Sequence, residues 1–161
     1  MKKLIYTLLI IIALTNNSFT AGTSSDSSDN SSNYTKAKNL IKAAKKYEKK
    51  GKTEKAVKRY TKAQKLLLKS NEKKPLQADT LNYLGFTTRK LGDYEKGEEF
   101  YLQGLQIEPN HKGINEYLGE LYVVTGRMDM AKERLEVLKT CNCEEYDELK
   151  EIIEGTKKSK Y

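Results

Sequence analysis

One pattern of apolar and small residues recurs along this chain, and it constrains the fold more than any other feature. In the segment 81–109, LNYLGFTTRKLGDYEKGEEFYLQGLQIEP, apolar residues return at helical spacing as far as Leu91. Gly92 interrupts the pattern, which resumes at Tyr94 and ends before Pro109. The segment therefore predicts two amphipathic helices joined by a short turn.

Small residues lie at positions where an amphipathic helix usually carries larger ones. Gly85, Gly97 and Gly104 all fall inside the two predicted helices. A glycine in a helix interior costs about 1 kcal/mol relative to alanine, so three of them need a reason in the packing. We expect the helix backbones to approach each other closely at these positions.

The same pattern occurs on both sides of this segment. Leu118 follows Leu84 by 34 residues, and Ala131 follows Gly97 by the same distance. An upstream copy is offset by 81 − 40 = 41 residues, and we assign the seven extra residues to a polar loop at 69–76, KSNEKKPL. The sequence therefore predicts three helical hairpins, at about 37–77, 78–111 and 112–142.

The spacing resembles the tetratricopeptide repeat (TPR), whose pattern is W-x2-L-G-x2-Y, then A-x3-F, then P. Leu81 stands at the Trp position, Thr88 at the Tyr position and Gly97 at the Ala position. The resemblance implies an all-α fold, a right-handed superhelix of about three TPR hairpins. Over 81–154 the chain is similar to small exported proteobacterial TPR proteins that end in a cysteine-containing capping helix.

The end of the chain supplies such a cap. Glu144 opens a segment with one apolar stripe, which includes Leu149 and Ile152 and ends at Gly155. A repeat array buries each unit only against its neighbours, so a terminal helix is needed to cover the last one. We predict a capping helix at 144–155, which closes a domain spanning 34–155 and is followed by a basic tail at 156–161.

The N-terminus has the features of an export signal. Lys2 and Lys3 precede an apolar run of about ten residues, shorter than the roughly 20 that a membrane-spanning helix needs. We expect 1–21 to be a signal peptide, with an uncleaved anchor as the alternative, and 22–33 to be a flexible linker rich in Ser, Asp and Asn. The protein is then expected in the periplasm or otherwise associated with the cell envelope.

Cys141 and Cys143, separated by one residue, are the only cysteines. We interpret them as a disulfide or a pair of thiols that fixes the turn before the last helix, with thiol redox chemistry as an alternative. Structural zinc takes four ligands, and the single histidine, His111, is interpreted as an ordinary loop residue a repeat away. No metal and no other cofactor is expected.

The sequence contains no recognisable catalytic group or phosphate-binding glycine loop, so we expect a protein that is not an enzyme and that recognises a partner. In the TPR family, the first helix of each repeat lines a concave groove. The positions here that match groove positions are Lys38, Lys45, Lys49, Asn82, Phe86, Arg89, Lys90, Glu116 and Glu120. Phe86 is interpreted as an exposed aromatic anchor, with packing between helices as the alternative. The predicted function is an adaptor that holds a peptide or protein segment in this groove.

The charge distribution supports an alternative. The segment 34–77 has sixteen Lys and Arg against three Asp and Glu, whereas 78–155 has nine against seventeen, so +13 is followed by −8. The lysine-rich first hairpin could instead bind an anionic polymer or membrane surface. Nucleic acid is not expected, because base-stacking aromatic residues are lacking. The carboxylate clamp of chaperone-binding TPR proteins looks absent, since only Lys45 matches it.

Overall fold

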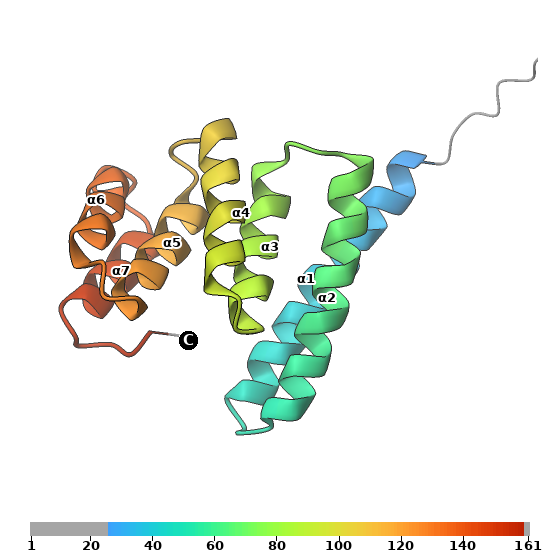
Figure 1. Ribbon diagram of the computed structural model, residues 1–161, viewed down its shortest axis with the longest axis horizontal. Helices are drawn as coiled ribbons and strands as arrows, with labels where there is room; N and C mark the ends of the chain where they lie inside the picture. Colours follow the sequence, from blue (N-terminus) through green and yellow to red (C-terminus); the bar gives the residue numbers. More distant parts are fainter. Residues whose placement is uncertain (1–25, 160–161) are drawn as a thin grey trace, which may run out of the picture.

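The computed structural model describes residues 26–159, and this part of the chain is all-α (Figure 1). It forms seven helices: α1 (Asp26–Glu48), α2 (Thr53–Lys73), α3 (Ala78–Lys90), α4 (Tyr94–Ile107), α5 (Lys112–Val124), α6 (Met128–Leu138) and α7 (Glu144–Ile153). Among the described residues, no helix combines the length and the apolar character needed to cross a membrane.

The helices pack as hairpins in the order of the sequence. α1 pairs with α2, α3 with α4 and α5 with α6, while α7 packs against both α5 and α6. Figure 1 shows the hairpins following one another from α1–α2 on the right to α5–α6 and α7 on the left. The predicted all-α architecture of three hairpins and a final capping helix is confirmed.

The turn inside each hairpin contains a glycine at an equivalent place. Gly51, Gly92 and Gly126 have φ angles of +66°, +97° and +75°, a left-handed conformation that favours glycine. At the middle turn, Asp93 also caps α4 by accepting a hydrogen bond from the backbone N–H of Lys96, at 3.0 Å. The turns therefore repeat with the same period as the helices.

The loop predicted at 69–76 was wrong over its first five residues. α2 continues to Lys73 and has 21 residues, whereas its counterpart α4 has 14. Nothing in KSNEK breaks a helix, and the helix ends just before Pro75, where the ring of proline disfavours helical backbone in the preceding residue. The seven extra residues make about two helical turns, so the buried side of α2 keeps the same direction along the longer helix.

The flexible linker predicted at 22–33 was also wrong over most of its length. α1 begins at Asp26, and Asn33 is already buried, with 8% of its surface exposed. A helix that has formed gains one hydrogen bond for each residue added, so weak helix formers can extend it. The predicted signal peptide, 1–21, lies outside the described residues.

The core explains the glycines of the middle hairpin. A Cβ atom at Gly97 would lie 3.2 Å from the carbonyl oxygen of Gly85, on the facing helix. A Cβ at Gly104 would overlap the Cδ1 atom of Ile114, which belongs to the next hairpin. The predicted close approach of the helices at these positions is confirmed.

The capping helix covers α5 at its own small residue. The side chain of Leu149, which is completely buried, packs where a Cβ at Gly119 would stand, at 2.5 Å. Ile152 is also buried, and Gly155 ends the segment with a φ of +73°. α7 therefore closes the apolar end of the third hairpin.

Candidate functional site

The first helices of the hairpins, α1, α3 and α5, contact one another in turn, and α7 packs against α5; we call the side that these four helices share the inner face. Aromatic rings connect these helices across it. The ring centroids of Tyr34 and Tyr83 are 5.9 Å apart, and those of Phe86 and Tyr117 are 5.2 Å apart. Side chains of α1, α3 and α5 therefore meet although they are distant in the sequence.

A cavity of about 410 Å³ lies between α1 and α3, and we call it the basic pocket. Its lining consists of Lys45, Glu48, Lys49, Phe86 and Lys90. The Nζ atom of Lys45 is 4.5 Å from the centroid of the Phe86 ring, and Lys90 pairs with Glu48 at 2.6 Å. The pocket thus combines an aromatic floor with three positive charges and one negative charge at its rim.

Glu48 is fixed from both sides. Its Oε2 atom accepts a hydrogen bond of 2.7 Å from the hydroxyl of Tyr60, while Oε1 pairs with Lys90. Burial, with the hydrogen bond and the negative charge of Glu48, raises the pKa of Tyr60. The hydroxyl therefore stays protonated and holds the carboxylate in place at the edge of the pocket.

Phe86 is not the exposed anchor that the sequence analysis predicted. Only 1% of its surface is exposed, and its ring centroid lies 5.8 Å from that of Tyr60 and 5.2 Å from that of Tyr117. The middle hairpin has neighbours on both sides, so a large side chain at this register is enclosed. The alternative interpretation, packing between helices, is the one that the structure shows.

Two predicted groove residues form a buried ion pair with each other. The Nη2 atom of Arg89 lies 3.3 Å from Oε2 of Glu120, and 1% and 0% of the two side chains are exposed. Arg89 also donates a hydrogen bond to the backbone carbonyl of Tyr117. Charges this deeply buried need a partner, so the pair connects α3 to α5 and is not presented at the surface as predicted.

Asn82 and Glu116 are also buried, with 6% and 4% of their surfaces exposed, but both line a second cavity, of about 420 Å³. This cavity lies between α3 and α5, beside His111. Of the other predicted groove residues, Lys38 is exposed and places its ammonium group 5.2 Å from the centroid of the Tyr34 ring. The lysines, more than the residues at the centre, are thus available on the inner face.

Three carboxylates gather where α5 and α7 meet, and we call them the acidic cluster: Glu116, Glu120 and Glu148. One oxygen of each lies within 4.8 Å of the others. Carboxylate oxygens are the ligands that hard cations such as Ca²⁺ use. In the structure, positive charge reaches the cluster from Arg89, which pairs with Glu120, and from Lys157, whose Nζ atom is 3.3 Å from Glu148.

His111 has a structural role that the sequence analysis missed. Its Nδ1 atom accepts a hydrogen bond of 3.1 Å from the backbone N–H of Ile114, so it caps the start of α5. Its Nε2 atom is 3.2 Å from a carboxylate oxygen of Asp79 on α3. The usual N-cap residues are Ser, Thr, Asp and Asn, so a histidine in this position gave little signal.

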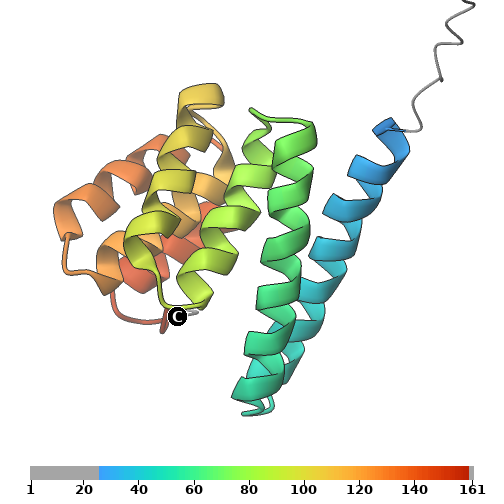
Figure 2. The same ribbon diagram turned by 45° about the vertical axis from the view of Figure 1, so that its right-hand side comes forward.

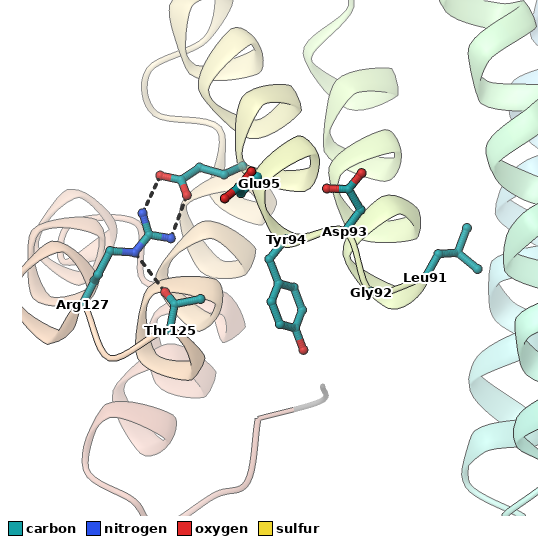
Figure 3. Close-up of a pocket in the computed structure, with 8 residues that line it drawn as sticks. Leu91, Gly92, Asp93, Tyr94, Glu95, Thr125 and Arg127 are labelled. Carbon is teal, nitrogen blue, oxygen red and sulfur yellow. Dashed lines mark hydrogen bonds and ion pairs between the residues drawn. The ribbon is translucent and has the colours of Figure 1, made fainter.

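A third cavity, of about 810 Å³, opens between the turns of the second and third hairpins (Figure 3). Arg127 donates two hydrogen bonds to Glu98, at 2.9 and 2.7 Å, and a third to Thr125. The guanidinium carbon of Arg127 is 4.5 Å from the ring centroid of Tyr122. Burial and the nearby Glu98 raise the pKa of Tyr122 to about 12. This group of side chains joins neighbouring repeats.

The turn between α6 and α7 is closed by a disulfide. Cys141 and Cys143 are bonded to each other, with their Cα atoms 5.2 Å apart. Asn142, between them, has a φ of +45°, a conformation that asparagine tolerates better than most residues. The bridge fixes the path of the chain into the capping helix.

Comparisons with known proteins agree with this architecture. Residues 78–111 match the model of the tetratricopeptide repeat, and no curated protein matches the chain. The second TPR domain of human RPAP3, solved in complex with an HSP70 peptide, is 17% identical, with a TM-score of 0.51 over 78% of this chain and 98% of that one. A chain of the CopN-Scc3 complex is 18% identical, with a TM-score of 0.50 over 76% and 69%. The chain therefore contains a tetratricopeptide repeat at residues 78–111, within a fold like that of TPR domains.

Proposed function

We propose that this protein is an adaptor without enzymatic activity, which holds a peptide or protein segment along its inner face. The observation that carries the proposal is the pairing of two opposite sites on this face. The basic pocket lies between α1 and α3, and the acidic cluster lies between α5 and α7. A segment that lies along the face would meet both charge signs in a fixed order.

The basic pocket favours a carboxylate or an aromatic side chain. Lys45 and Lys49 supply positive charge, and the ring of Phe86 supplies an apolar floor under it. An ion pair in a partly enclosed pocket is screened less than one on an open surface, and the fixed order of charges selects one direction for the ligand. Affinity and orientation would thus come from different parts of the face.

The ligand differs in chemistry from the one seen on the structural neighbour. The RPAP3 domain is solved with an HSP70 peptide, whereas the positions of this chain that match a carboxylate clamp include Ile41, Tyr83 and Gly113. None of these three residues has a positively charged side chain that could form an ion pair with a terminal carboxylate, and Lys45 alone supplies positive charge. A chaperone tail is therefore not the proposed partner.

The test is selection of peptides from a random library displayed on phage, with the full chain as bait. A Lys45→Glu, Lys90→Glu variant reverses two charges at the basic pocket. A matched control, Lys58→Glu with Lys62→Glu, makes the same change in net charge on exposed positions of α2. A peptide family that binds the native chain and the control but not the first variant supports the proposal. Equal binding to all three proteins contradicts it.

We also propose that the protein works in the cell envelope. The apolar run after Lys2 and Lys3 supports export, and the bond between Cys141 and Cys143 is of the kind that persists in oxidising compartments. Fractionation of cells, with mass measurement of the native protein, is the test. A chain in the envelope that begins near residue 22 supports cleavage, whereas an intact chain in the cytoplasm contradicts export.

A second function is favoured by one observation on the first hairpin. Most of its lysines are exposed, on α1 and α2 alike, and several recur on α2 at three- to four-residue spacing: Lys55, Lys58, Lys62, Lys65 and Lys69. Such a surface attracts anionic polymers or lipid headgroups. Binding to vesicles that contain phosphatidylglycerol, weakening steeply with salt and abolished by Lys58→Glu with Lys62→Glu, would favour this function. Absence of vesicle binding at low salt would exclude lipid as the anion.

A further inference from the structure

Just beyond the capping helix, residues 156–159 stay in contact with the molecule. After Gly155, the backbone N–H groups of Thr156 and Lys157 both donate to the carbonyl of Glu151, at 3.0 and 3.1 Å. The hydroxyl of Thr156 donates to the same carbonyl, at 3.1 Å. These three hydrogen bonds reverse the chain at the end of α7 and direct it back over the helix. We call residues 156–159 the C-terminal tail.

The tail then reaches the acidic cluster. The Nζ atom of Lys157 lies 3.3 Å from Glu148 on α7 and 3.3 Å from Glu151. Two residues later, the hydroxyl of Ser159 donates a hydrogen bond of 3.3 Å to Glu120. Glu120 is on α5 and is completely buried, so this contact crosses from the last helix to the interior of the inner face.

The tail and the acidic cluster are complementary in charge as well as close in space. Desolvation lowers the pKa of Lys157, but hydrogen bonds to Glu151 and Glu148 outweigh it and raise that pKa overall, so the ammonium form is favoured. The segment 78–155 has a net charge of −8, and the tail brings Lys157 onto its acidic end. A basic segment is therefore the kind of ligand that this end of the face accepts.

We propose that the C-terminal tail is an intramolecular ligand of the inner face, which a basic segment of the partner must displace from the acidic cluster. This inference rests on the proposed adaptor function and specifies the ligand at one end of the face. The partner segment would carry a lysine or arginine for Glu148 and a hydroxyl or amide donor for Glu120. The tail keeps these carboxylates satisfied until the partner arrives.

The competition can be measured with a synthetic peptide, TKKSKY, which has the sequence of residues 156–161 and so contains the tail. A Lys157→Ala, Ser159→Ala variant removes the internal contacts from the full chain but leaves the acidic cluster intact. Removing the two partly exposed ion pairs of Lys157 and one hydrogen bond to a charged group should raise the affinity for the added peptide about fivefold to tenfold. Lys158→Ala is the matched control, because Lys158 is exposed, and its affinity should equal that of the native chain.

Nuclear magnetic resonance gives a second readout that does not depend on any ligand. Backbone order parameters of Thr156 to Ser159 should match those of α7 in the native chain and should fall in the double variant. Peptide affinity that is equal in all three proteins, or tail order parameters as low as those of a free chain end in the native protein, would overturn the proposal. Phage selection at the basic pocket can still succeed in that event, so the two proposals fail separately.

Discussion

Replacing Gly85 by alanine tests a close contact between the two helices of the second hairpin, α3 and α4. An added Cβ atom would lie 2.5, 2.6 and 2.8 Å from three atoms of the Tyr101 ring. Ordinary carbon contacts begin at about 3.5 Å, so the ring or the helix must move by about 1 Å. Tyr101 is completely buried and belongs to the core around Ile114 and Leu118, so its ring has nowhere to turn.

The expected cost follows from two opposing terms. Overpacking a core costs typically about 1–3 kcal/mol, and a rigid ring places this site at the upper end. Alanine recovers about 1 kcal/mol because it is the better helix former. The net loss of about 2 kcal/mol in the free energy of unfolding corresponds to a Tm lower by about 5–12 °C for a domain of this size.

Thermal and urea unfolding followed by circular dichroism measure this loss. Gln103→Ala, at an exposed position of α4, is the control and should stay within about 0.5 kcal/mol of the native chain. Tyr101→Leu makes room for the added methyl group, so Gly85→Ala should cost much less in that background. If Gly85→Ala instead stabilises the protein by the full helix-propensity gain, the close approach of α3 and α4 is wrong.

Three further predictions concern polar groups. Arg89→Ala should lower the free energy of unfolding by about 3–5 kcal/mol in urea titrations, because it leaves Glu120 buried without its ion partner, and Arg89→Met with Glu120→Met should recover most of that loss. His111→Ala should lower the Tm through the loss of a helix cap worth about 1 kcal/mol, whereas His111→Asn should keep most of it; equal losses would deny the capping role. The third concerns alkaline pH: because the pKa of Tyr122 is about 12 in the fold, above its ordinary value of about 10, the stability that this group contributes is complete below pH 10 and is lost as the pH rises toward 12. Tyr122→Phe should flatten the decline of Tm over that range, and an unchanged slope would contradict the shift.

The fold was predictable because the repeat is visible in the spacing of apolar and small residues along the chain. Leu84, Gly92 and Gly97 each have an equivalent residue 34 positions later, and helical packing of small residues depends on near neighbours. The boundaries of the first hairpin were less accessible, because the residues 69–73 suit a loop and a helix equally. The preceding turns of α2 favour continuation of the helix through these residues, because each added residue gains a hydrogen bond. The composition of the segment alone does not show this.

The inner face was harder to predict for a different reason. A helical pattern tells which residues share a side, but not how deeply the next hairpin covers them, so Phe86 and Arg89 were placed on the right helix and at the wrong depth. The contact between Ser159 and Glu120 joins residues 39 positions apart and follows from no periodicity. Contacts of this kind depend on the assembled superhelix and become visible only there.

The longer first hairpin has a consequence for how this architecture can change its size. The α1–α2 hairpin projects beyond the other two (Figure 2), and its second helix is seven residues longer than α4. Two whole turns add about 10 Å to the helix, and every side chain keeps its orientation around the helix axis. An insertion of about seven residues can therefore lengthen α2 without rotating its buried side, whereas an insertion of five would turn that side toward water. The length of this hairpin can therefore change only by whole helical turns, and natural or engineered variants of it should differ by one or two turns.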